Sequence, residues 1–158
     1  MRQRNSATQP AALILPVLLA LTGCNTAPPA EDAALDVLAR SQQCGIEQQG
    51  WGRVESRENI PPALQQRVDL QENLLTLWVA MGQRPTGGYH LELPPFALRD
   101  GDGVHFDVIL HAPPEDAVVT QALTSPCAVV QLDAPADERV NLRMVGPEVP
   151  PIDPRPRY

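Results

Sequence analysis

The chain has 158 residues, a formal net charge of −7 at pH 7 and 43% hydrophobic residues. Its length is sufficient for one domain with its own hydrophobic core, even after a leader segment is set aside. The excess of acidic residues argues against nucleic acid as a partner and against attraction to anionic lipid headgroups.

Residues 1–23 have the composition of an export signal, with two arginines ahead of a short apolar run, 11–21. That run is shorter than the roughly 20 residues needed to span a bilayer. It ends in Leu21-Thr22-Gly23-Cys24, which resembles the lipobox of bacterial lipoproteins. The resemblance implies cleavage after Gly23 and acylation of Cys24 with chains such as palmitate, which would anchor the protein to a membrane. The alternatives are an ordinary secretory signal with a chance cysteine, or an uncleaved anchor.

Asn25 follows the cysteine, at the position where aspartate is associated with retention in the inner membrane. By resemblance to sorted lipoproteins, we expect an outer-membrane location facing the periplasm. Residues 24–30 contain two prolines, which is typical of a tether. The expected organisation is then a single β-rich domain over residues 31–146, followed by a proline-rich tail over residues 147–158.

The first predicted element of the domain is a short helix over residues 31–43. Acidic residues lie at its start and Arg40 lies near its end, which suits a helix dipole. Leu35 and Leu38 are three positions apart, as on one side of a helix. Gly45 follows and is expected to end the helix.

Once Cys24 is assigned to lipid, Cys44 and Cys127 are the two cysteines left. In an oxidising periplasm such a pair favours a disulfide, which would join the start of the domain to a late strand. The alternative is a pair of buried free thiols.

The chain beyond these elements is predicted to be β-structure. The most apolar stretch, Leu74–Met81, is typical of a buried central strand. Alternation then predicts a strand over residues 89–93, a shift of register at Pro94-Pro95, and a hairpin turn at Asp100-Gly101-Asp102-Gly103.

After that turn, apolar residues alternate strictly from Val104 to Leu110, which predicts one buried face. Further short strands are expected over residues 118–123, 128–132 and 140–145. Short strands separated by turn residues predict a mainly β fold, a small antiparallel sandwich or barrel, preceded here by the short N-terminal helix.

Ionisable side chains on the opposite face of the same strand form the clearest candidate metal site. His105, Asp107 and His111 fall there, and His90 could lie beside them. Alternate residues of a strand stand roughly 6–7 Å apart, so a shared ion would need a further ligand. A solvated sheet face is the simpler interpretation. We predict no metal, no cofactor and no catalytic residue, because motifs for a serine nucleophile, a phosphate loop or a complete calcium loop are also missing from the sequence.

Two segments are more distinctive than any of these. The first is Gly82-Gln83-Arg84-Pro85-Thr86-Gly87-Gly88-Tyr89, and the second runs from Pro113 to Val130 and includes Thr120 and Thr124-Ser125-Pro126. In this order and spacing they resemble the C-terminal domain of the PrcB family, which takes its name from a lipoprotein subunit of a spirochaete surface protease complex. The resemblance covers about residues 74–145.

The resemblance implies a small β-rich accessory domain without catalysis of its own, which binds a protein partner such as an envelope protease complex. Proline and glycine in the first segment would give a stiff loop with accessible backbone, which suits a binding surface. The predicted partner-binding residues are Arg84, Pro85, Thr86, Gly87, Gly88, Tyr89, Thr120, Thr124, Ser125 and Pro126.

Two other interpretations of the first segment stay open. It could be a structural turn only, with Tyr89 packed under it, since glycines between strands usually serve geometry. It also resembles the Pro-Thr-Thr-Gly-Tyr loop of chagasin-type cysteine-protease inhibitors, which have an immunoglobulin-like sandwich. In that comparison Arg84 replaces an asparagine and Gly87 a threonine, and the second inhibitory loop, with Arg-Pro-Trp, is missing.

Overall fold

The computed structural model describes residues 30–146, so Cys24 and the proline-rich tail lie outside the described residues. The described residues form eight strands of one sheet. The strands are β1 (Glu31–Ser41), β2 (Gly50–Arg53), β3 (Leu74–Ala80), β4 (His90–Glu92), β5 (Phe96–Asp100), β6 (Gly103–His111), β7 (Cys127–Pro135) and β8 (Val140–Val145). A single 3-10 turn, Arg57–Asn59, interrupts the long connection between β2 and β3. The mainly β prediction is therefore confirmed.

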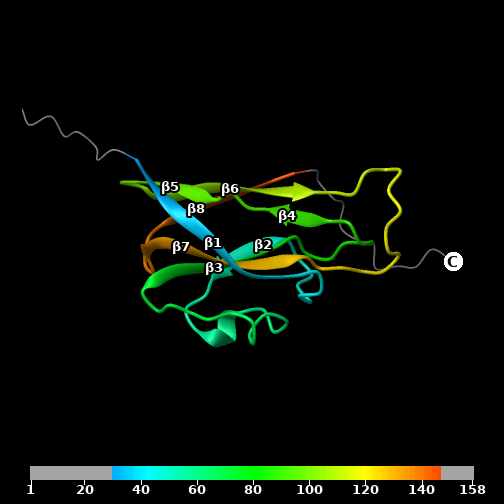
Figure 1. Cartoon of the computed structure of the whole chain (residues 1–158), viewed down its shortest axis with the longest axis horizontal. Coiled ribbons are helices and arrows are strands. Elements are labelled where there is room, and N and C mark those ends of the chain that lie inside the picture. The colour runs from blue at the N-terminus through cyan, green and yellow to red at the C-terminus, as the bar shows by residue number, and fades with distance from the viewer. Residues whose placement is uncertain (1–29, 147–158) are drawn as a thin grey trace, which may run out of the picture.

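The sheet is folded over on itself into two layers that form an open barrel (Figure 1). One layer contains β5, β6, β4 and β8, and the other contains β7, β3 and β2. The strand β1 belongs to both, because its first part pairs with β5 and its second part pairs with β7. All pairings are antiparallel except that of β8 with β6, which is parallel.

The predicted N-terminal helix is wrong, because residues 31–41 form the strand β1. Ala33 and Leu35 are buried in alternation, as in a strand, and a bulge then shifts the register between Val37 and Ala39. The extra residue of a bulge breaks the two-residue repeat. Leu35 and Leu38, which are three positions apart in the sequence, can therefore both pack against buried residues, and the same spacing is typical of one side of a helix.

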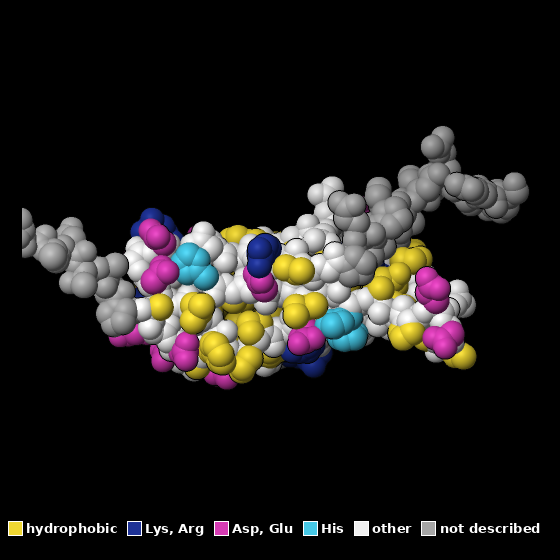
Figure 2. Space-filling view, turned by 90° about the horizontal axis from the view of Figure 1, so that it is seen from above, with side chains coloured by type: hydrophobic (Ala, Val, Ile, Leu, Met, Phe, Trp, Pro, Cys, Tyr) yellow, Lys and Arg dark blue, Asp and Glu magenta, His cyan; other side chains and the backbone are white. Residues whose placement is uncertain are grey.

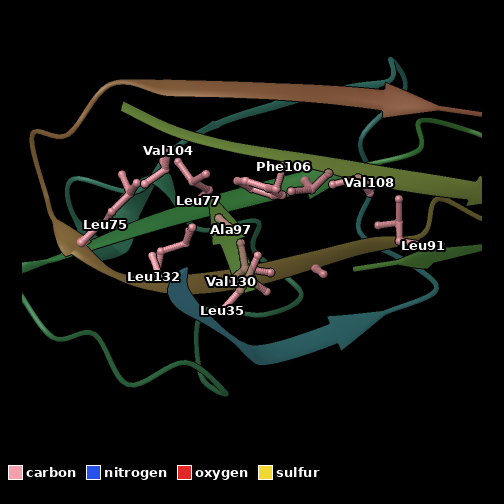
Figure 3. Close-up of a cluster of buried hydrophobic side chains, with 14 of the residues drawn as sticks. Leu35, Leu75, Leu77, Leu91, Ala97, Val104, Phe106, Val108, Val130 and Leu132 are labelled. Atoms are coloured by element: carbon pink, nitrogen blue, oxygen red, sulfur yellow. The ribbon is translucent and has the colours of Figure 1, made fainter. Parts of the chain in front are cut away.

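The main core lies between the two layers (Figure 3). Val104, Phe106 and Val108 point inward from β6 (Figure 3), and Leu110 is buried as well, which confirms the predicted alternation. Leu75 and Leu77 of β3, together with Val130 and Leu132 of β7, meet them from the opposite layer. Val79 of β3 belongs to the same buried cluster. Within residues 30–146, no helix is long and apolar enough to cross a membrane.

The predicted breaks and turns between the strands of the β-region are largely confirmed. Residues 93–95 separate β4 from β5, and both strands pair with β6. Asp100 pairs with Gly103 across the predicted hairpin, where Gly103 has a φ of 118°. The strand expected at 118–123 is wrong, because these residues belong to a long loop, 112–126, between β6 and β7.

Candidate partner-binding site

The two distinctive segments meet at the end of the molecule where β3 ends and β7 begins. Arg84 and Thr124 form an isolated antiparallel bridge, with N–H···O distances of 2.7 and 3.0 Å between their backbones. The Gly87 N–H donates to the Thr120 carbonyl at 2.9 Å, and the Thr124 hydroxyl donates to the Thr86 carbonyl at 2.8 Å. Four hydrogen bonds thus join segments that are far apart in sequence. We call the resulting structure the loop end; it contains residues 82–89 and 112–126, with residues 42–49 packed against them.

Arg84 lies inside this loop end and is only 6% exposed. Its guanidinium donates to the Met81 carbonyl and to the Gln49 side chain, and it lies 5.9 Å from the centroid of the Tyr89 ring. Burial lowers the pKa of Arg84 from its ordinary value, an effect that Tyr89 partly opposes. Its Nε is the one buried side-chain polar atom of the described chain that has no hydrogen-bond partner. Arg84 therefore braces the loop from within.

Gly88 is the tightest position in the Pro-Thr-Gly-Gly-Tyr segment. It has a φ of 87°, and a Cβ at this position would lie 2.8 Å from Pro113 Cβ and 3.0 Å from Val119 Cγ1. Gly87 is different, since its φ is not positive and its Cβ would lie 3.4 Å from the nearest atom, Thr120 Cβ. The second glycine therefore leaves space in which the long loop packs.

Ser125 connects the loop end to the segment after β1, and Pro126 connects it to the end of β3. The Ser125 hydroxyl accepts a hydrogen bond from the Gly45 N–H at 2.7 Å, and its carbonyl accepts one from the Cys44 N–H at 3.1 Å. The Pro126 carbonyl accepts from the Met81 N–H at 2.9 Å. Both Ser125 and Pro126 are buried, so these contacts stabilise the backbone.

The structure contains the disulfide between Cys44 and Cys127. Their Cα atoms are 6.0 Å apart, within the usual range for a disulfide. Cys127 is the first residue of β7, so the bond attaches the segment after β1 to the same loop end.

Burial divides the ten predicted partner-binding residues into two groups. Four of them, Arg84, Thr124, Ser125 and Pro126, are buried. The others are exposed or half-buried: Pro85, Thr86, Gly87, Gly88, Tyr89 and Thr120. The buried group supports the loop end, and a partner could touch only the second group.

The candidate metal residues lie on the outer face of the layer formed by β4, β5, β6 and β8, and each has an ion-pair or stacking partner there. His105 Nε2 lies 3.0 Å from Asp100, His111 Nε2 lies 2.6 Å from Glu92, and Asp107 pairs with Arg143 at 2.6 Å. The His90 ring stacks on His111, with centroids 4.6 Å apart. Within residues 30–146, no group of three or more metal-binding side chains is present.

Two carboxyl groups of this face, those of Asp100 and Asp107, are stabilised in their charged forms. The Asp102 backbone N–H and then His105 hold the pKa of Asp100 below its ordinary value. The hydrogen bonds and charge of Arg143 lower the pKa of Asp107, and Asp107 in turn raises the pKa of Arg143. These groups are exposed, so their ion pairs contribute little to stability.

The sequence interpretation missed a hollow at the opposite end of the molecule, with a volume of about 870 Å³. It lies between the end of β2, the 54–73 connection and the turn after β7. The Arg53 guanidinium donates hydrogen bonds there to the backbone carbonyls of Ala136 and Glu138. No sequence motif in the lining segments predicts the hollow, because it arises from the packing of segments that are separate in the sequence.

Residues 75–133 match the family model described as PrcB C-terminal. The comparisons with curated proteins and with solved structures gave no match. The matched region runs from β3 into β7 and contains the whole loop end apart from the residues contributed by the 42–49 segment. The resemblance seen in the sequence is confirmed to this extent: residues 75–133 of this chain match the PrcB C-terminal family model.

Proposed function

We propose that this chain is a lipid-anchored accessory protein that binds a protein partner, as part of an envelope protease complex. The observation that carries the proposal is the family match over residues 75–133, which includes both distinctive segments. In the fold these segments form a single loop end joined by backbone hydrogen bonds. A stiff end of this kind limits the conformational entropy lost on binding.

The role proposed for the domain is binding without catalysis. The resemblance to PrcB supports it, because the family takes its name from a non-catalytic subunit. The loop end supports it as well, since its polar groups are engaged in holding the backbone: Arg84, Thr124 and Ser125 all donate or accept within the protein.

We propose that Cys24 carries the lipid that places this domain at the outer membrane, on its periplasmic side. Replacement of Cys24 by alanine is expected to move most of the protein from the membrane fraction to the soluble fraction, because the acyl chains supply the affinity for the bilayer. Cell fractionation followed by immunoblotting measures this. Alanine at Cys44 together with Cys127 is the matched cysteine control and should stay on the membrane. Unchanged membrane association of Cys24→Ala would contradict the anchor.

Accessory binding and protease inhibition can be distinguished by measuring the activity of the protease that the protein binds. We expect the full-length protein, purified from its own envelope in mild detergent, to co-purify with a protease whose activity is retained. Papain serves as a second probe, because chagasin-type inhibitors act on proteases of its class. Inhibition of either protease at nanomolar concentrations would overturn the accessory role and support the inhibitor interpretation. Purification without any protease would contradict the proposed association.

A further inference from the structure

Val118 is the most exposed apolar side chain of the described residues, with a relative accessibility of 105%. It lies in the long loop 112–126, where Leu123 is also 52% exposed. Figure 2 shows apolar and acidic side chains side by side at the end of the molecule away from the start of β1. Loops longer than about 12–15 residues without secondary structure are uncommon in compact domains and are usually either functional or disordered. A fully exposed valine in such a loop calls for a physical explanation.

The exposure of Val118 follows from the way in which the loop is held. Its neighbour Val119 is half-buried and packs over Gly88, where even one added Cβ would clash. The Thr120 carbonyl accepts a hydrogen bond from the Gly87 N–H at 2.9 Å, and the Ala117 N–H donates to Pro114 at 3.0 Å. Val119 is thus packed against the Pro-Thr-Gly-Gly-Tyr segment and Ala117 is held in a turn of the loop, while Val118 between them is exposed to solvent.

The charges next to Val118 have one sign. Loop 112–126 contains Glu115 and Asp116 and no lysine, arginine or histidine. Arg84 is the one cation of the facing segment, and it is buried and hydrogen-bonded within the loop end. A partner that covers Val118 therefore meets two carboxylates without a nearby exposed cation in either segment.

We propose that loop 112–126 is the contact element of this protein, with Val118 as its anchor and the Pro-Thr-Gly-Gly-Tyr segment as its support. The partner is a protein that offers an apolar pocket for Val118 and Leu123, with arginine or lysine side chains at the rim of the pocket facing Glu115 and Asp116. Buried apolar anchors surrounded by complementary rim charges are the usual organisation of such interfaces. This inference rests on the proposed protein-binding function and assigns its surface.

The chain provides a matched control for the anchor. Leu98 of β5 is 52% exposed, the same fraction as Leu123, but it lies on the outer face of a sheet layer and not in the loop. A photo-crosslinking amino acid is placed at position 118 or at position 98 of the full-length protein in its own cells. We expect a discrete crosslinked protein from position 118 and none from position 98. Mass spectrometry identifies the crosslinked protein and the peptide attached to residue 118.

Binding of the identified protein is then measured with purified components. Val118→Asp is expected to weaken the affinity by about tenfold or more, as for a central anchor, while Leu98→Asp leaves it within about twofold. The double variant Glu115→Gln/Asp116→Asn is expected to weaken binding and to reduce its dependence on salt. The control pair Asp69→Asn/Glu72→Gln, at the opposite end of the molecule, should change neither quantity. Unfolding curves confirm that each variant is folded.

The outcomes separate the inference from the proposed function. Crosslinking from position 98 but not from position 118 would overturn the inference while protein binding stands. Crosslinks between copies of this chain at position 118 would overturn it in favour of self-association. An affinity unaffected by Val118→Asp would contradict the role of Val118 as the anchor. An affinity independent of salt would contradict the basic side chains proposed at the rim of the partner's pocket. Failure of both positions to crosslink to any protein would contradict the proposed function as well.

Discussion

Removal of the Cys44–Cys127 disulfide is expected to lower the free energy of unfolding by about 4 kcal/mol. The two cysteines are 83 positions apart, so the bond restricts a long stretch of the unfolded chain. Both side chains are buried, and alanine replaces them without adding polar atoms. The variant Cys44→Ala/Cys127→Ala is compared with the oxidised wild type by urea unfolding, followed by tryptophan fluorescence from Trp51 and Trp78.

Reduction of the wild type provides the matched control for this prediction. Reduced wild type should unfold close to the double alanine variant, whereas a reductant should not change the variant itself. An unfolding midpoint that is the same in oxidised and reduced wild type would show that the bond does not stabilise the fold. The loop end should be most affected, because Cys44 and Cys127 flank the contacts of Ser125 with the segment after β1.

Gly88→Ala is expected to destabilise the protein by about 2–5 kcal/mol. A positive φ costs a residue with a Cβ roughly 1–2 kcal/mol, and overpacking adds roughly 1–3 kcal/mol. The overpacking arises because the new Cβ would lie 2.8 Å from Pro113 Cβ and 3.0 Å from Val119 Cγ1. Urea unfolding measures the loss directly.

Gly87→Ala is the control for this prediction, one position earlier in the same segment. Its Cβ would be in ordinary contact with Thr120, at 3.4 Å, so we expect a loss below about 1 kcal/mol. Equal losses at the two positions would contradict the packing of the long loop over Gly88. The pair is also informative about binding: Gly87→Ala should leave the partner's affinity nearly unchanged if the segment is a support and not the contact itself.

The sequence predicted the β-region well where local rules are strong. Alternation from Val104 to Leu110, the glycines of the 100–103 hairpin and the break at Pro94-Pro95 each reflect a constraint of neighbouring residues. The strand β1 was mistaken for a helix because its register is set by contacts with β5 and β7, and a bulge hides its two-residue repeat. Pairing with distant strands thus overrode the local pattern.

The candidate site was likewise predictable from the sequence only in part. Its residue types and the order of its two segments were visible in the sequence, and both segments lie within residues 75–133, which match the PrcB C-terminal family model. Burial was not visible. Arg84, Thr124 and Ser125 resemble binding residues in the sequence, yet all three are enclosed. Val118 does not stand out in the sequence, where it begins an expected strand, because an exposed apolar residue cannot be told from a buried one by its neighbours alone.

The amino-acid sequence by itself determined the β-rich class, through alternation and local backbone preference, and it carries the two segments that resemble the PrcB C-terminal family. The tertiary structure alone decided which residues support the loop end and which reach solvent. The physical reason is that burial depends on what packs against a side chain. At this end of the molecule the packing partners come from segments around residues 45, 84 and 124, which only the folded chain brings together.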